Sequence, residues 1–273
     1  MKTVDRLIAN VQVSSTEELI QAVEALSPYF GTIRVDMSEA VALGCPEVFG
    51  VINSHDRQVF FDCRLNLDPQ NMADTVIELA RAEIGIFSVQ ASAGMAAMKA
   101  AVANKGVCQV LAVTVPPHFS QTDCERVYGI SLATKTIQLA HEAKNAGVDG
   151  ILCSSAQLRM LRQSGEFEGV FMVVTNILPS VSSEDKGKGV WGAFEAVTGG
   201  ADAMVVTSLQ SELWAVGAEG AEATRKVLGF LLSTVEHGLD HVHRAVKSVA
   251  SGIDKAADGV GKAKTKVDPD DDQ

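Results

Sequence analysis

The sequence lacks the cysteine pairs, the long apolar run and the excess of basic residues that would assign it to an easily recognised class. Its five cysteines are odd in number and scattered, with no Cys-x-x-Cys pair, so neither a disulfide framework nor a zinc knuckle is indicated. No run of about 18 apolar residues occurs, and the first residues lack a basic-then-apolar signal, so we expect a cytoplasmic protein without a membrane-spanning helix. Acidic side chains outnumber basic ones by 34 to 23, and the net charge of -11 disfavours nucleic acid and anionic membranes as partners of the main body.

What the sequence does have is a strand-then-helix pattern that recurs eight times. The predicted strands are apolar and cover residues 7–13, 32–35, 58–62, 85–89, 107–113, 150–153, 170–174 and 203–206. Helices are predicted up to residue 26, from residue 38, at 68–82 and 93–103, and after residues 130, 155, 189 and 219. A chain of 273 residues holds one α/β barrel, which takes about 250 residues. We therefore expect a closed parallel (β/α)8 TIM barrel, with an open doubly wound sheet as the alternative because periodicity alone does not show closure.

Two connections stand out by their length. They are residues 115–128 after the fifth predicted strand, which carry Pro116, Pro117 and His118, and residues 176–188 after the seventh. Long loops at the carboxyl ends of barrel strands often cover a ligand, but a tolerated insertion explains them equally well.

The composition changes after about residue 235, and around this point apolar residues begin to recur every seven positions, in an apolar heptad stripe. The stripe consists of two interleaved sets: Leu232, Leu239, Val246, Ile253, Val260 and Val267, and Val235, Val242, Val249, Ala256 and Ala263. We therefore expect a barrel domain at 1–235, an amphipathic helical extension at 236–267 and a disordered acidic tail at 268–273. The extension is predicted to pack on its own barrel or on a partner's extension in a homo-oligomer. Contact with a membrane surface is not favoured, because Trp and Phe anchors are missing, and a mostly disordered tail is the third interpretation.

No cofactor or metal site is predicted. No P-loop or Gly-x-Gly-x-x-Gly follows a predicted strand. His237 and His241 lie four residues apart, with Glu236 and Asp240 beside them, but the spacing places no third ligand for a metal ion.

The stretch from Val59 to Pro69 is the best candidate for a functional site. In a strand, side chains alternate between faces, so Asp62 and Arg64 share one face while Phe61 and Cys63 share the other. A carboxylate and a guanidinium at the carboxyl end of a barrel strand lie where ligands bind in α/β folds. Asp68 and Pro69 are then expected to begin the next helix.

Several collinear motifs resemble the orotidine 5'-phosphate decarboxylase family, including its relatives the hexulose-phosphate synthases and ketogulonate-phosphate decarboxylases. The resemblance spans about residues 5–230 and rests on Val-Glu-Ala-Leu at 23–26, Phe-Asp-x-Arg at 61–64, Val-Gln-Ala-Ser-Ala-Gly at 89–94, Val-Thr-Val at 113–115, the run at 139–154 and Gly-Ala-Asp-Ala-Met-Val-Val at 200–206. It implies the family's barrel and, if the protein is active, a carbon-carbon lyase of the decarboxylase type.

The catalytic pattern of this family is altered at two of three positions. The family carries Asp-x-Lys-x-x-Asp, in which the lysine protonates the carbanion left by carbon dioxide and the last carboxylate acts across a dimer interface. Here Asp62 matches the first Asp, Arg64 stands at the lysine position and Leu67 stands at the position of the last Asp. A guanidinium stays protonated at every accessible pH, so Arg64 is suited to holding an anion but is a poor proton donor.

The binding positions implied by the resemblance differ as well. Gln12 stands where the family has a ribose-contacting Asp, and Arg34 stands where it has a lysine or, in the sugar-phosphate branch, a metal-binding Glu. Arg34 would repel a magnesium ion. His118 falls near the pyrimidine-contacting serine, Lys186 near the phosphate-binding glutamine, and residues 207–208 replace the phosphate-binding Gly-Arg.

The predicted site is a cationic cluster around one carboxylate, made of Gln12, Arg34, Asp62, Arg64, His118 and Lys186, with Asp62 and Arg64 as its catalytic pair. Such a cluster suits an anionic, phosphorylated small molecule. The leading hypothesis is an altered or inactive relative that binds such a molecule or acts through its oligomeric surface. The alternatives are an active decarboxylase on a phosphorylated nucleotide or sugar, with Arg64 and His118 replacing the lysine, and a scaffold that acts through its C-terminal helix. An internal ion pair between Asp62 and one arginine, in a site that binds nothing, is the structural alternative.

Overall fold

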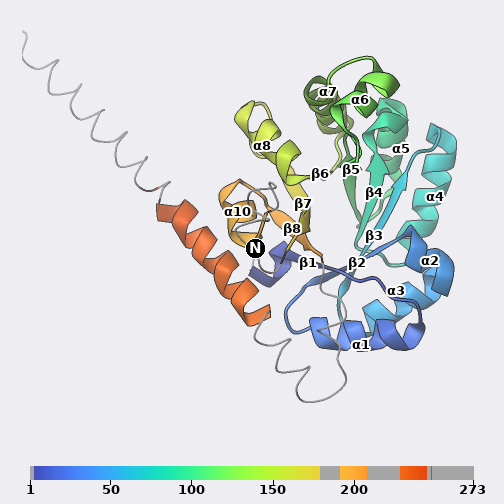
Figure 1. Cartoon of the computed structure of the whole chain (residues 1–273). Coiled ribbons are helices and arrows are strands. Elements are labelled where there is room, and N and C mark those ends of the chain that lie inside the picture. The colour runs from blue at the N-terminus through green and yellow to red at the C-terminus, as the bar shows by residue number, and fades with distance from the viewer. Residues whose placement is uncertain (1–2, 179–190, 208–227, 245–246, 248–273) are drawn as a thin grey trace, which may run out of the picture.

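The computed structural model describes residues 3–178, 191–207, 228–244 and 247. Eight parallel strands form a closed barrel in which each strand pairs with the next and β8 pairs with β1 (Figure 1). The strands are β1 (Leu7–Asn10), β2 (Thr32–Asp36), β3 (Gln58–Leu65), β4 (Ile86–Gln90), β5 (Gln109–Val113), β6 (Gly150–Cys153), β7 (Phe171–Ile177) and β8 (Ala203–Val206). The predicted barrel is confirmed, and the open sheet is wrong.

The helices lie outside the strands and cover the barrel (Figure 1). They are α1 (Thr16–Leu26), α2 (Met37–Leu43), α3 (Cys45–Ser54), α4 (Pro69–Arg81), α5 (Met95–Asn104), α6 (Gln121–Tyr128), α7 (Leu132–Ala146), α8 (Ser155–Gln163) and α10 (Ala193–Thr198), with short 3-10 turns η1 (Thr3–Arg6) and η2 (Ala91–Ala93). As predicted, α4 begins at Asp68 and Pro69. The Asp68 carboxylate accepts the backbone N–H groups of Gln70 and Asn71, each at 3.1 Å.

Two connections contain more helix than predicted. Between β2 and β3 the chain forms two helices, because Gly44 takes a φ of 90° that stops α2, and Pro46 stands in the first turn of α3. After β5, the predicted long loop at 115–128 contains α6. Ser120 and Asp123 form a capping box at the start of α6, and Gly129 ends it in the left-handed region.

The barrel interior is apolar through most of its height and polar at its carboxyl end. An inner cluster fills the lumen with side chains from seven strands: Ile8, Phe60, Ile86, Leu111, Val113, Leu152, Val173, Ala203 and Val205. The other faces of the strands pack against the helices in a second, larger cluster that includes Phe61 and Cys63. Above the inner cluster, β1 to β4 contribute buried polar side chains, and this is where the candidate site lies.

Residues 228–244 form a helix on the outside of the barrel beside α10 (Figure 1). Leu228, Leu231 and Val235 are fully buried in the barrel's outer cluster. Gly238 lies so close to α10 that a Cβ there would be 3.3 Å from the side chain of Val197. This helix passes through residue 235, where we placed the domain boundary, so the first part of the apolar stripe packs on the chain's own barrel. Apart from residue 247, the predicted extension beyond 244 and the acidic tail lie outside the described residues.

Among the helices that the structure describes, none is both long enough and apolar enough to cross a membrane.

Candidate functional site

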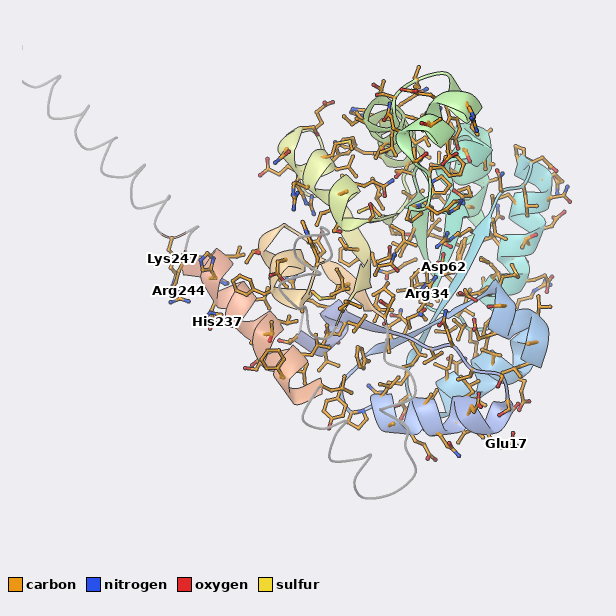
Figure 2. All side chains as sticks on the ribbon, in the orientation of Figure 1. Glu17, Arg34, Asp62, His237, Arg244 and Lys247 are labelled. Atoms are coloured by element: carbon orange, nitrogen blue, oxygen red, sulfur yellow. The ribbon has the colours of Figure 1, made fainter. Side chains whose placement is uncertain are left out.

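A cavity of about 290 Å³ opens at the carboxyl end of the barrel. Its lining comes from β1, β2, β3, β7, β8 and the segments that follow them, and from the loop after β5: Asn10, Gln12, Arg34, Asp36, Arg64, Pro117, Thr175, Asn176, Val205 and Thr207. Nearly all of these side chains are polar. Figure 2 shows Arg34 and Asp62 next to each other in the barrel.

Arg34 and Asp62 form the buried ion pair of the site. Arg34 is 8% exposed and Asp62 is 3% exposed. The Asp62 carboxylate accepts Nε–H of Arg34 at 3.1 Å and also a bond from Nη2, while Nη1 of Arg34 donates to the side-chain oxygen of Asn10. These contacts fix the guanidinium across β1, β2 and β3 and hold it at the wall of the cavity.

A second arginine, Arg64, binds the same carboxylate from the solvent side. Its Nη2 lies 3.1 Å from Oδ2 of Asp62, and its Nε lies 3.3 Å from both carboxylate oxygens. The Arg64 side chain is 32% exposed, whereas that of Asp62 is fully buried. Asp62 is therefore bracketed by two guanidinium groups, and the outer one is in contact with the cavity.

The backbone at Arg64 departs from a regular strand. Its φ is 46°, and the register between β3 and β4 shifts between Phe61 and Leu65. Ser88 on β4 stabilises this bulge, because its hydroxyl accepts the backbone N–H of Arg64 at 2.9 Å and donates to Asp62 at 2.5 Å. Asn176, with a φ of 61°, lies at a similar register shift between β7 and β8 and also lines the cavity. Backbone strain of this kind concentrates at functional sites.

The two arginines also keep the Asp62 carboxyl group ionised. Burial of the carboxyl raises its pKa, but the positive charges of Arg34 and Arg64 and the hydrogen bonds from Arg64 and Ser88 outweigh this and hold the pKa below its usual value. Asp62 is therefore ionised at neutral pH, and with the two guanidinium groups it leaves one net positive charge at this wall.

A pair of acids, Asp36 and Glu39, lies where β2 meets α2. Asp36 lines the cavity and caps α2, and Glu39 is buried with 5% exposure. The pKa of Asp36 is lowered, because hydrogen bonds from Glu39 and Ser38 and the charge of Arg34 outweigh its burial. Burial and the hydrogen bond with Asp36 raise the pKa of Glu39 to about 7.

The structure brings most of the predicted site residues together. Gln12, Arg34 and Arg64 line the cavity, and Asp62 lies directly behind the two arginines. His118 is exposed with its ring centroid 5.1 Å from that of Phe119, and its neighbour Pro117 lines the cavity in its place. Lys186 lies outside the described residues.

The polar residues of the site that sequence reasoning missed include Asn10, Asp36, Ser88, Thr175 and Asn176. Asn10, Ser88 and Thr175 are buried, and Asp36 stands directly where α2 begins. A signal for them did exist. Each is a polar residue inside or at the carboxyl end of an otherwise apolar strand, and such a residue needs a partner.

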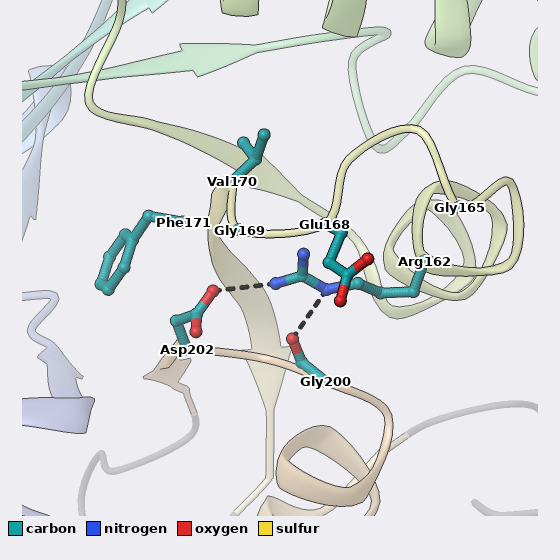
Figure 3. Close-up of a pocket in the computed structure, with 8 residues that line it drawn as sticks. All are labelled: Arg162, Gly165, Glu168, Gly169, Val170, Phe171, Gly200 and Asp202. Atoms are coloured by element: carbon teal, nitrogen blue, oxygen red, sulfur yellow. Dashed lines mark hydrogen bonds and ion pairs between the residues drawn. The ribbon is translucent and has the colours of Figure 1, made fainter. Parts of the chain in front are cut away.

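A second cavity, of about 420 Å³, lies at the opposite end of the barrel where β7 and β8 begin (Figure 3). Its arginine, Arg162, is engaged by the protein: it donates to the carbonyl of Gly200 at 3.0 Å, to that of Phe167 at 2.8 Å and to the carboxylate of Asp202 at 2.8 Å. The same Asp202 oxygen accepts the backbone N–H of Met172 at 2.8 Å. These bonds join α8, β7 and β8, and the amino-terminal face of such barrels serves stability.

The ligands that the cavity at the carboxyl end can bind follow from its hydrogen-bond donors. Arg34 and Arg64 can bind an anion, and the Asn, Gln and Thr side chains can bond hydroxyl groups. Among the described residues, no lysine lines this cavity, and no group of three His, Cys, Asp or Glu is placed to hold a metal ion. Leu67 is half-buried against the outer cluster.

Comparisons with known proteins agree with this architecture. An orotidine 5'-phosphate decarboxylase from Geotalea daltonii is 28% identical over 211 residues, covering 74% of this chain and 87% of the relative. The same enzyme from Syntrophomonas wolfei is 28% identical over 244 residues, covering 85% of this chain and 99% of the relative. The crystal structure of orotidine 5'-phosphate decarboxylase from Lactobacillus acidophilus matches with a TM-score of 0.65 at 21% identity, covering 82% of this chain and 99% of that one, which shows a shared fold.

The model of one family, orotidine 5'-phosphate decarboxylase / HUMPS, matches residues 5–209, which is most of the barrel. The chain belongs to the orotidine 5'-phosphate decarboxylase / HUMPS family.

Proposed function

We propose that this protein is a catalytically altered member of its family that binds an anionic, phosphorylated small molecule at the carboxyl end of the barrel without decarboxylating it. One observation carries the proposal: the Asp62 carboxylate is bound by two guanidinium groups, and the described lining of the cavity offers no lysine to deliver a proton. Arg64 occupies the position from which the family's lysine acts. It supplies a fixed positive charge and a planar set of donors, which suit phosphate or carboxylate.

The arrangement of the arginines supports binding more than proton transfer. Two hydrogen-bonding nitrogens of Arg64 are already directed at Asp62, so the guanidinium plane is fixed before a ligand arrives. Arg34 is fixed in the same way by Asp62 and Asn10. An anion that enters meets preorganised cations, so little conformational freedom is lost on binding.

The binding test is thermal unfolding with sulfate, uridine 5'-monophosphate and ribose 5-phosphate. At a concentration 100 times its Kd, a ligand stabilises the folded state by about 2.7 kcal/mol, which for a domain of this size raises the Tm by roughly 5 to 10 °C. Arg64→Gln should abolish this shift. Arg81→Gln is the matched control, because Arg81 is exposed on α4 and forms an ion pair with the neighbouring Glu78, away from the cavity.

The catalytic test is carbon dioxide release from orotidine 5'-monophosphate. We expect no turnover above the uncatalysed rate. Turnover by the wild-type protein that Arg64→Gln abolishes would overturn the proposal, and the absence of a Tm shift with all three ligands would remove its binding part.

An active decarboxylase is the second candidate, and the relatives favour it. Proteins named orotidine 5'-phosphate decarboxylase match this chain at 28% identity over 87 to 99% of their own length. In that case Arg64 would have to orient the substrate while another group delivers the proton. The same turnover assay separates the two functions.

A further inference from the structure

The start of α2 holds two carboxyl groups around one hydroxyl group at the rim of the cavity. Oδ1 of Asp36 accepts the backbone N–H of Ser38 at 3.1 Å and the Ser38 hydroxyl at 2.5 Å. Oε2 of Glu39 accepts the backbone N–H of Asp36 at 3.2 Å and lies 3.3 Å from the same Ser38 hydroxyl. Asp36 faces the cavity, and Glu39 is buried behind it.

The donors around this pair are too few for two ionised acids. The Ser38 hydroxyl has one hydrogen, and its shorter contact is with Asp36. Glu39 is then left with backbone N–H groups alone, those of Asp36 and of Glu39 itself, and has little contact with water. A buried carboxylate with so few donors is costly, and a proton on Glu39 relieves that cost. This agrees with the raised pKa of Glu39, about 7, and with the lowered pKa of Asp36.

The charge of the pair matters to the cavity because Asp36 and Arg34 both belong to its wall. With Glu39 protonated, the pair carries one negative charge, and with Glu39 ionised it carries two. The second charge opposes an anion held at Arg34 and Arg64. By thermodynamic linkage, an anion that enters must in turn make the pair hold its proton more tightly.

We propose that Asp36 and Glu39 make this a proton-linked anion site, in which binding of the anion is accompanied by uptake of a proton onto the pair. This inference rests on the anion site of the proposed function and adds a regulatory element to it. Its consequence is tighter anion binding on the acid side of neutrality and weaker binding on the alkaline side. The affinity of the site therefore depends on pH as well as on the chemistry of the ligand.

Other charged groups lie near the pair and must be separated from it. The elements packed against α2 are β2, β3 and α3, and their charged residues are Arg34, Asp36, Asp62, Arg64 and Glu47. Asp62 is already ionised at neutral pH, and the arginines keep their charge. His118 lies beside the lining residue Pro117, and its protonation also adds positive charge at this end of the barrel.

The test uses sulfate as the probe, because sulfate does not change charge between pH 6 and pH 8. We expect its apparent Kd to rise about fivefold or more over this range, the effect of one added negative charge near the anion. Glu39→Gln should remove this pH dependence and keep the cap, because the glutamine carbonyl still accepts the Asp36 N–H. Glu47→Gln is the matched control on the exposed first turn of α3, and His118→Gln controls for the imidazole. Both should retain the dependence.

A second measurement uses the wild-type protein alone. Calorimetric titration with sulfate at pH 7, in two buffers with different ionisation enthalpies, should show net proton uptake, which His118→Gln retains. Sulfate binding of equal strength at pH 6 and pH 8, without proton uptake, would overturn this inference and leave the proposed function standing. Dependence that His118→Gln abolishes would also overturn it. No sulfate binding at either pH would overturn both proposals.

Discussion

Removing the Arg34 guanidinium should expose how strongly the site depends on its buried charge. In Arg34→Met the aliphatic part of the side chain is kept, while the fully buried Asp62 carboxylate loses the partner that binds it through two nitrogens. Asn10, which is 7% exposed, loses the donor on its side-chain oxygen in the same change.

The size of the effect follows from what remains around Asp62. Breaking a buried ion pair by removing one partner costs about 3 to 5 kcal/mol. Asp62 keeps Arg64 at 3.1 Å and Ser88 at 2.5 Å, so we expect a loss of about 3 kcal/mol in the free energy of unfolding at pH 7.

The stability loss in Arg34→Met should depend on pH. Asp62 has a lowered pKa in the wild-type protein, so its contribution to stability is present above the pKa of the unfolded chain and is lost as the pH falls through the folded pKa. In Arg34→Met the carboxyl keeps its burial but loses its main cation, so its pKa should rise. The difference between the two proteins should therefore be larger at pH 7 than at pH 4, where the carboxyl of the variant is protonated, and should shrink further as the pH falls through the folded pKa of the wild-type Asp62.

Urea unfolding at pH 7 and pH 4 measures both quantities. Arg81→Met is the control, since Arg81 is 69% exposed on its side chain and should cost less than about 1 kcal/mol. A double-mutant cycle with Asp62→Asn should show coupling between Arg34 and Asp62. The reasoning is refuted if Arg34→Met costs no more than Arg81→Met at pH 7, or if its cost is unchanged at pH 4.

Three further predictions concern single side chains. Ser88→Ala should cost about 2 kcal/mol in urea unfolding, because the part-buried backbone N–H of Arg64 loses its acceptor and the buried Asp62 carboxylate loses a donor. An unchanged midpoint would contradict this. Leu231→Ala should cost about 2 to 4 kcal/mol and speed hydrogen exchange in residues 228–244, whereas unchanged exchange would show that the helix does not depend on its buried face. Because the pKa of Glu39 is raised to about 7, its stability contribution is present at acid pH and lost as the pH rises through 7. Glu39→Gln should therefore remove a fall in stability between pH 5 and pH 8, and an identical fall in both proteins would argue against it.

The sequence predicted the barrel well because the signal repeats. Eight apolar strands alternate with helices, and a parallel sheet covered on both faces needs such strands. The start of α4 at Asp68 and Pro69 was predictable for a local reason, since a side-chain cap and a fixed proline φ act within a few residues. The extra helix α6 was missed because its own capping box was treated as part of a long loop.

The bulge at Arg64 was beyond the sequence. Strict alternation predicts Asp62 and Arg64 on one face, and the two side chains do meet. They meet through a residue with a φ of 46° and a shifted register, however, and the Ser88 hydroxyl bonds both its N–H and Asp62. The register depends on how two whole strands pair, so no local sequence pattern in β3 predicts the bulge.

By itself the sequence determined which residues form strands and which strand ends are polar, because these properties belong to single positions or short repeats. Only the tertiary structure decided that Asn10, Arg34, Asp62 and Ser88 share one hydrogen-bond network. These residues come from four different strands, and barrel closure brings their side chains together. The same closure placed Arg34 and Asp36 of β2 and Arg64 of β3 in the wall of one cavity.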